Sequence, residues 1–209
     1  MASGARAKRA LPVYVTLAEL HRMLEACASE RDRLLLKLLW HTGARISEVL
    51  SLRAGDLTRT GVRLPNRKQG LWRTGPDGSR QHVRLQAEKH VLLHPAFLAE
   101  LRELTRGLPP QELLLRSTRG GPLSRSQAWR IIGSSAARAG VFKRRFGEDT
   151  ERPLWPHCLR HGYAVNLLLQ GTPITVVQEQ LGHASLAATQ VYTRLVDPKK
   201  QEIIAGLKF

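Results

Sequence analysis

Apolar residues recur at helical spacing through most of this chain. In the stretch TLAELHRMLEAC they fall on one face of a helix, at Leu17, Leu20, Leu24 and Cys27. Thr16 opens that stretch and Glu19 stands three residues later, which is the pattern of a capping box, so a helix is predicted to begin there. The same spacing predicts a second helix through LLLKLLWHTG, which Gly43 ends, and a third through ARISEVLSL.

Helical patterns return in the second half of the chain. HPAFLAELREL predicts a helix after Pro95, and SRSQAWRIIGSSAARAG predicts one that Ser124 caps and Gly140 ends. From residue 156 onward the sequence predicts short helices, separated at a Gly-Thr-Pro step, at Gly182 and at an Asp-Pro step. We therefore expect a mainly α-helical protein.

A segment with a different pattern of apolar and polar residues lies between these two groups of helices. GVRLPNRKQG and SRQHVRLQ alternate basic and apolar residues, and TGPDG between them is typical of a turn. This pattern predicts a small antiparallel β-sheet of two or three strands near residues 55–86, and hence an α+β fold class that is mainly α-helical. Residues 1–15 have the character of a basic lead-in or linker, and residues 16–209 that of one domain.

The charge of the chain is strongly basic. Lys+Arg number 33 against 17 Asp+Glu, a net charge of +16, which favours a polyanionic partner such as double-stranded DNA. The segment 59–84 holds seven Lys or Arg residues and one acid, and the segment 113–147 holds eight and no acid. Six side chains from these two segments are candidate DNA contacts: Arg67, Arg73, Arg80, Arg125, Arg130 and Lys143.

The number of cysteines and the length of the apolar runs limit the classes of protein to which this chain can belong. Cys27 and Cys158 are too few for a disulfide framework and are typical of a reduced, cytoplasmic protein. No apolar run reaches membrane-spanning length, since RDRLLLKLLW is both short and charged. The basic N-terminus is not followed by an apolar segment, so no secretory signal is expected. A cytoplasmic protein without a membrane partner is predicted.

Three short segments carry the candidate chemistry: ARISE, HCLRH and LGHASLAATQVYTR. The last contains Tyr192, whose phenol has an ordinary pKa of about 10 and needs a base and fixed cations to become a useful nucleophile. Arg45 and Arg160 carry planar guanidinium groups, which match the oxygens of a phosphodiester with paired hydrogen bonds. Glu48, one helical turn from Arg45, either holds one of these arginines in place or is a plain surface carboxylate.

Histidines complete the set. His157 and His161 stand four residues apart, which is the spacing of the zinc site in HExxH enzymes. Here Cys158 takes the place of the general-base Glu, and Arg160 would set a positive charge beside the metal, so no metal site is expected. We interpret His161 as a core residue that is hydrogen-bonded to the backbone. His183, in LGHAS, is either a donor to a phosphate oxygen or a loop histidine at a helix cap.

Together, ARISE, HCLRHGYA and LGHASLAATQVYTR resemble, in order, spacing and chain position, the catalytic domain of the tyrosine recombinases, the phage integrase family. The resemblance covers nearly the whole chain, from about Leu17 to the C-terminus. It implies the tyrosine-recombinase catalytic fold and the cleavage of DNA by Tyr192, which would form a 3′-phosphotyrosyl link and release a 5′-hydroxyl. Arg45 and Arg160 would bind the scissile phosphate.

The resemblance also implies roles for the remaining polar groups. His157 would take and return a proton at the tyrosine or hydroxyl oxygen, and His183 would hydrogen-bond the phosphate. The family uses a lysine on a β-hairpin as the general acid for the leaving 5′-oxygen, and Lys68, in NRKQG, is the only lysine in that region. The alternative for Lys68 is a phosphate contact without a proton role. Glu48 and His161 would support these groups, and the chemistry would need neither a metal nor a nucleotide cofactor.

The function that the resemblance implies is that of a site-specific DNA recombinase, or integrase. It would act as a homotetramer on two DNA sites through a Holliday junction, and as a monomer when free. Two alternatives stay open: the same chemistry in a type IB topoisomerase-like or hairpin-forming strand transferase, and a non-catalytic DNA-binding protein on the same fold. Most members carry an N-terminal core-binding domain, whereas only residues 1–15 precede the first helix here. The tail VDPKKQEIIAGLKF would dock either on its own domain or on a neighbouring subunit.

Overall fold

The computed structural model describes residues 12–66, 70–84, 87–144, 151–182 and 192. Its helices are α1 (Leu17–Glu25), α2 (Glu30–Thr42), α3 (Ile46–Val49), the 3-10 turn η1 (Ala54–Asp56), α4 (Pro95–Leu104), α5 (Arg125–Arg138), α6 (Pro156–Leu169) and α7 (Ile174–Leu181). Its strands are β1 (Gly61–Asn66), β2 (Gly70–Thr74), β3 (Arg80–Arg84), β4 (Ala87–Leu92), β5 (Phe142–Arg144) and β6 (Glu151–Pro153). The α+β, mainly α-helical class that the sequence predicted is confirmed.

The starts of α1 and α5 agree with their sequence signals. Thr16 and Glu19 form the predicted capping box: the Glu19 N–H donates to Thr16 Oγ1 at 3.3 Å, and the Thr16 N–H donates to the Glu19 carboxylate at 2.8 Å. Ser124 caps α5 by accepting a hydrogen bond from the Gln127 N–H at 3.2 Å. These caps satisfy donors that have no partner inside a helix, and so they determine where the two helices begin.

A glycine in the left-handed conformation ends α2 just ahead of Arg45. Gly43 has a φ of 55°, and a Cβ at this position would lie 2.3 Å from a ring carbon of Tyr163. Only glycine satisfies both this backbone conformation and this contact. The turn leaves Arg45 at the N-cap of α3, which has four residues and is therefore shorter than the ARISEVLSL pattern predicted.

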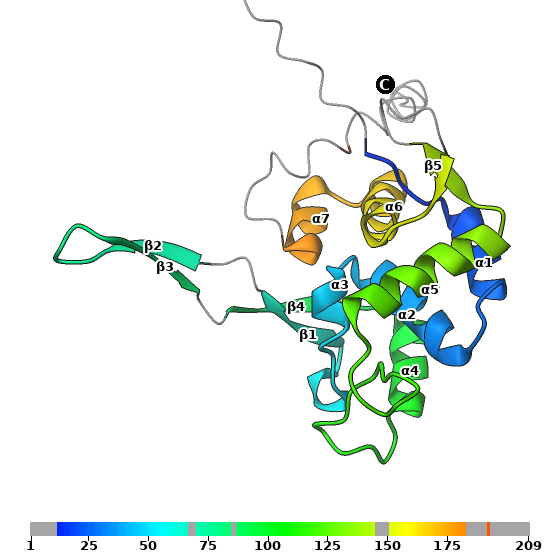
Figure 1. Ribbon diagram of the computed structural model, residues 1–209, viewed down its shortest axis with the longest axis horizontal. Coiled ribbons are helices and arrows are strands. Elements are labelled where there is room, and N and C mark those ends of the chain that lie inside the picture. The colour runs from blue at the N-terminus through cyan, green and yellow to red at the C-terminus, as the bar shows by residue number, and fades with distance from the viewer. Residues whose placement is uncertain (1–11, 67–69, 85–86, 145–150, 183–191, 193–209) are drawn as a thin grey trace, which may run out of the picture.

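The centre of the helical body is formed by α2, which packs against α6 (Figure 1). Leu35, Leu38 and Leu159 are among the fully buried side chains of these two helices. Because burying one leucine stabilises the fold by about 1.5–3 kcal/mol, this packing holds α6, which carries the HCLRH segment, firmly in place. The Val15 N–H also donates to the Cys158 carbonyl at 3.2 Å. No helix among the described residues is both long enough and apolar enough to cross a membrane.

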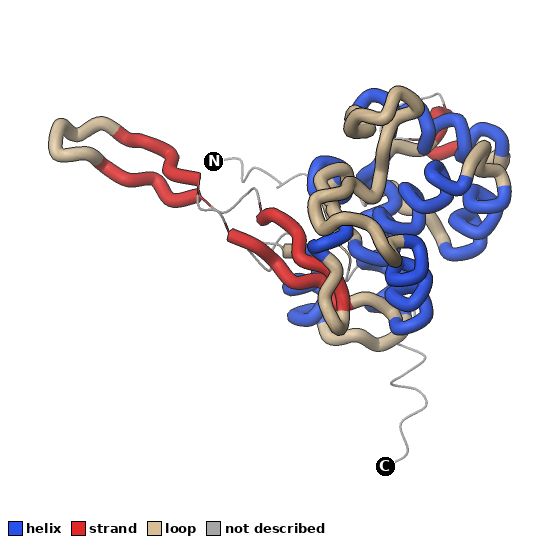
Figure 2. Tube along the Cα trace, turned by 90° about the horizontal axis from the view of Figure 1, so that it is seen from below, coloured by secondary structure: helices blue, strands red, loops and turns tan. Residues whose placement is uncertain are grey.

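The predicted antiparallel strands are confirmed, although they form separate two-stranded ladders. β1 pairs with β4 from Gly61↔Leu92 onward, and β2 pairs with β3 from Gly70↔Arg84 onward. The strands continue past the expected limit of residue 86 to Leu92, and β5 pairs with β6 in a further ladder that the sequence pattern did not predict. The β2–β3 hairpin projects away from the helices in both Figure 1 and Figure 2.

The turn predicted at TGPDG closes the β2–β3 hairpin. The Gly75 N–H donates to the Ser79 carbonyl at 2.8 Å, and Asp77 Oδ1 accepts a hydrogen bond from the Ser79 N–H at 3.0 Å. An aspartate whose carboxylate accepts from the backbone two residues later is typical of such a turn. The local residues therefore determine where the chain reverses.

Candidate active site

Glu48 is a buried carboxylate that lies between two cations. Arg45 Nη1 donates to Glu48 Oε1 at 2.6 Å, and the Arg45 N–H donates to Oε2 at 3.0 Å. Lys89 of β4 approaches the same carboxylate, with its Nζ 3.0 Å from Oε2. The Glu48 side chain is 0% exposed, so the interpretation as a surface carboxylate is wrong, and its pairing with Arg45 is observed directly.

The surrounding cations keep Glu48 ionised despite its burial. Burial alone would raise the pKa of Glu48, but the charge of Lys89 and the hydrogen bonds from Arg45 and Lys89 outweigh it, so the pKa lies below the ordinary 4.5. At neutral pH the carboxylate is therefore an anion. A charge-assisted hydrogen bond to an ionised carboxylate holds the Arg45 guanidinium in one orientation.

Arg160 is the second guanidinium of the site and is only 5% exposed. Its Nη1 donates to the Gly43 carbonyl at 2.5 Å, and its Nη2 donates to the Leu181 carbonyl at 2.9 Å. Both carbonyls lie at helix C-termini, those of α2 and α7, where the helix dipole favours a cation. Burial and, next, the charge of Arg45 lower the pKa of Arg160 to about 10, so Arg160 remains a cation at neutral pH. The two arginines thus lie close enough to repel each other and to attract a shared anion.

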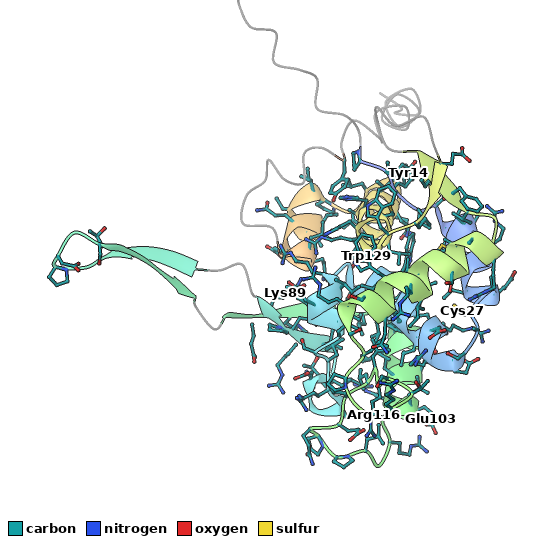
Figure 3. The ribbon with its side chains drawn as sticks, in the orientation of Figure 1. Tyr14, Cys27, Lys89, Glu103, Arg116 and Trp129 are labelled. Atoms are coloured by element: carbon teal, nitrogen blue, oxygen red, sulfur yellow. The ribbon has the colours of Figure 1, made fainter. Side chains whose placement is uncertain are left out.

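Lys89 completes this cluster, although it falls outside the segment in which the sheet was predicted. It is 8% exposed, and its amine donates to the Leu181 carbonyl at 3.2 Å in addition to its ion pair with Glu48. Figure 3 shows it where β4 meets α3 and α7. The sequence did hold a signal for it: Lys89 is two residues from Val91, which is apolar and buried, so both side chains lie on the same face of the strand.

The phenol of Tyr192 is buried against a histidine of α6. Tyr192 is 2% exposed, and its hydroxyl lies 2.7 Å from His161 Nδ1. Burial raises the pKa of Tyr192, and the positive charge of Arg160 opposes that rise. The interpretation of His161 as a core residue bonded to the backbone is therefore corrected: His161 is partly buried, and its Nδ1 pairs with the phenol. The backbone interpretation failed because a partner 31 residues along the chain leaves no trace in the local pattern.

The protonation of His161 decides what this contact can do. Burial and, next, the electrostatic effects of His157 and Arg160 lower the pKa of His161 to about 4. At neutral pH the ring is uncharged, so Nδ1 accepts the phenolic hydrogen bond when the ring proton is on Nε2. A neutral imidazole therefore holds the phenolic oxygen at one position beside α6.

The other predicted catalytic residues are placed only in part. His157 is exposed on α6, with its ring centroid 6.3 Å from that of His161. Lys68 and His183 lie outside the described residues, so their roles remain predictions. Within the described ranges, no three His, Cys, Asp or Glu side chains gather as a metal site would require.

The predicted DNA contacts fall into distinct environments. Arg125 and Arg130 are exposed on α5, and Arg73 and Arg80 belong to the projecting hairpin, on β2 and β3. The Lys143 amine instead pairs with a carboxylate oxygen of α1, that of Glu19, at 2.6 Å. Arg67 lies outside the described residues. The exposed arginines of α5 thus remain the better candidates, because the charge of Lys143 is already paired within the fold.

The lowered pKa of His161 predicts a pH dependence of stability. The unfolded chain binds a proton at the ordinary pKa of 6.5, whereas the folded protein does so only near 4, so the free energy of unfolding should rise with pH across this window. Replacing His161 with asparagine, which keeps a polar atom near the Nδ1 position, should flatten the rise by about 1–3 kcal/mol. Urea unfolding at several pH values measures this difference. Equal slopes for the two proteins would contradict it.

Comparison with known proteins shows which proteins this chain is similar to. Residues 14–198 match the phage integrase family. The tyrosine recombinase XerD of Chlorobaculum tepidum is 32% identical to this chain over 195 residues, which cover 90% of this chain and 59% of that protein. The chain thus spans less than two thirds of the length of this relative.

Solved structures share the fold. The crystal structure of XerA recombinase superimposes with a TM-score of 0.67 at 24% identity, over 96% of this chain and 68% of that chain. The site-specific recombinase XerH, in a post-cleavage complex with its palindromic difH substrate, superimposes with a TM-score of 0.63 at 25% identity, over 94% of this chain and 54% of that chain. These likenesses confirm the catalytic-core fold that the sequence resemblance implied.

Proposed function

Because the chain belongs to the phage integrase family of tyrosine recombinases, we propose that it is a site-specific DNA recombinase that cuts and rejoins DNA through Tyr192. The observation that carries this proposal is the contact of the Tyr192 hydroxyl with His161 Nδ1 at 2.7 Å, next to the buried cation of Arg160. A phenol held by a neutral imidazole beside fixed positive charge is suited to attack on phosphorus.

The scissile phosphate would bind at the arginines. Arg45, Arg160 and Lys89 surround the single negative charge of Glu48, so the cluster has a net positive charge when Lys89 is protonated. Arg45 retains 17% of its side-chain surface, through which it can meet an anion. The charge that develops on the oxygens of a pentacoordinate phosphorus would be stabilised more strongly than that of the ground state.

The chemical step would proceed by transesterification. Tyr192 is 2% exposed, so its phenol must become more accessible before it meets DNA. Its oxygen would then bond to phosphorus while the bond to the 5′-oxygen breaks, giving a 3′-phosphotyrosyl link. We assign the phenolic proton to His157, on the exposed side of α6, the phosphate contact to His183, and the proton for the 5′-oxygen to Lys68. The reverse attack by a 5′-hydroxyl would rejoin the strand, so neither a metal nor a nucleotide cofactor is required.

The proposed partner is double-stranded DNA. The net charge of +16 and the exposed arginines of α5 support it, as does the likeness to XerH, whose structure holds a DNA substrate. We further propose that four copies assemble on two DNA sites and pass through a Holliday junction, with free monomers in a bacterial cytoplasm. Phosphate contacts should dominate DNA binding by this chain, so its affinity should fall steeply as the salt concentration rises.

Covalent trapping tests the proposed function. Duplexes with a nick close to the cleavage point lose the short 5′-hydroxyl fragment, so a phosphotyrosyl protein cannot rejoin the strand and accumulates. Nicked duplexes tiled across the DNA that flanks this gene should yield a covalent adduct on a denaturing gel, and mass spectrometry should place the nucleotide on Tyr192. Tight DNA binding without an adduct on any duplex would favour the non-catalytic alternative. Relaxation of supercoiled DNA without junction products would favour the topoisomerase alternative.

A further inference from the structure

We propose that Lys89 is a positioning residue for the phosphate site, which acts through Glu48 on Arg45 and through the Leu181 carbonyl beside Arg160. The proposal rests on the recombinase function proposed above. Lys89 Nζ lies 3.0 Å from Glu48 Oε2 and 3.2 Å from the Leu181 carbonyl oxygen. Its amine therefore touches one partner of each arginine and connects the two guanidinium groups.

The two arginines depend on these shared partners. Glu48 uses one carboxylate oxygen, Oε1, for the Arg45 guanidinium and the other, Oε2, for Lys89. The Leu181 carbonyl accepts hydrogen bonds from both Arg160 and Lys89. Without the lysine, the carboxylate would lose one of the two cations that fix it, and the position of the Arg45 guanidinium would loosen with it.

A role in packing alone does not account for a lysine at this position. The neighbour in phase on β4, Val91, is apolar and buried, and an apolar side chain at position 89 would continue that face. Burying an ammonium group removes it from water at a cost that apolar residues avoid. The backbone is also shaped around Lys89: Gly182 has a φ of 64°, and a Cβ there would lie 2.9 Å from Lys89 Cδ. Packing alone would therefore favour an apolar residue here, and what the lysine adds is its contact with Glu48 and the Leu181 carbonyl.

The geometry also separates Lys89 from a proton donor to the leaving oxygen. The Lys89 side chain is 7% exposed, and its amine already contacts a carboxylate and a carbonyl within the fold. Burial lowers the pKa of Lys89, and the negative charge of Glu48 opposes that shift. The ammonium form donates to both oxygens at once, which is the form that a connecting role requires.

The experiment compares three variants of the whole chain on the duplex that gives the wild-type adduct. Lys89→Met should lower the single-turnover cleavage rate by roughly 10²-fold, because displacing a phosphate-binding group by about 1 Å has effects of that size. The Kd for the same DNA should change by less than about 3-fold, because phosphate contacts spread over the surface set most of the affinity. Lys89→Arg, which keeps the charge, should recover part of the rate. Lys37→Met is the matched control, because it removes a Lys–Glu pair, that with Glu100 at 2.7 Å, between α2 and α4.

Two further measurements keep the outcomes distinct. A substrate with sulfur in place of the leaving 5′-oxygen needs no proton donor, so it should not restore the rate of Lys89→Met; full recovery would make Lys89 a general acid and overturn the positioning role. A Lys89→Met rate equal to that of Lys37→Met would also overturn it. If the wild-type protein forms no adduct, the recombinase function fails, and arginine side-chain NMR signals still test the inference. Hydrogen exchange at Arg45 should then be faster in Lys89→Met than in Lys37→Met, and equal exchange would overturn it.

Discussion

Replacement of Tyr192 with phenylalanine should abolish the covalent link to DNA and lower strand cleavage by about 10⁴-fold or more, since loss of a catalytic nucleophile has effects of at least this size. The variant loses only the hydroxyl, so the 2%-exposed ring can remain in the same packing. The fold should therefore survive. The loss of the hydrogen bond to His161 Nδ1 should reduce the free energy of unfolding by about 1–3 kcal/mol. Adduct formation on nicked duplexes and urea unfolding measure the two effects.

The chain offers a matched control for this experiment in Tyr163. This residue is also a buried tyrosine, 8% exposed, in the same apolar cluster as Tyr192. Burial raises the pKa of Tyr163 to about 12, and its ring packs against the turn at Gly43. Tyr163→Phe should keep the adduct, while DNA binding should persist in both variants because Arg45 and Arg160 are untouched. An adduct that survives in Tyr192→Phe would show that another residue is the nucleophile.

Local signals account for much of the fold. The capping pairs at Thr16 and Ser124 lie within three residues of their partners, and the left-handed turn at Gly43 depends on a single residue. Such caps and turns can be predicted from the sequence because the interactions that form them join residues close together in the chain. The ends of the strands were harder to predict from the sequence. β4 pairs with β1 across the whole β2–β3 hairpin, and pairing over that distance is not determined by neighbouring residues.

The site was predictable as a set of residue types but not as a network. Arg45, Arg160 and Tyr192 stood out because guanidinium and phenol groups suit phosphate chemistry. Their partners did not, because the Arg160 hydrogen bond to the Gly43 carbonyl spans 117 residues and that of Lys89 to the Leu181 carbonyl spans 92. A lysine in phase with a buried apolar residue is the one sequence signal that would have found Lys89. Its partners follow only from the packing of β4 against α7 and β1 against α3.

The largest effect on stability is expected when Glu48 is replaced with glutamine. Removing one member of a buried ion pair leaves uncompensated charge, which typically costs about 3–5 kcal/mol. Here two cations, Arg45 and Lys89, would lose their shared anion while a third, Arg160, remains close by. The free energy of unfolding, measured by urea denaturation at neutral pH, should fall accordingly. Cleavage should fall as well, because the Arg45 guanidinium would no longer be fixed.

The destabilisation expected for Glu48→Gln can be distinguished from the loss of an exposed ion pair by its size and by its dependence on pH. Glu100→Gln removes the partner of Lys37, but the Glu100 side chain is 40% exposed, so its loss should cost about 1 kcal/mol or less. The folded pKa of Glu48 lies below the ordinary 4.5, so its stabilisation is present above that pH and is lost as the pH falls through the lowered value. Stability should therefore depend less on acid pH in Glu48→Gln than in the wild type. If Glu48→Gln and Glu100→Gln lose the same stability, the buried cations are balanced by other groups and Glu48 is not the anion that holds the arginine site together.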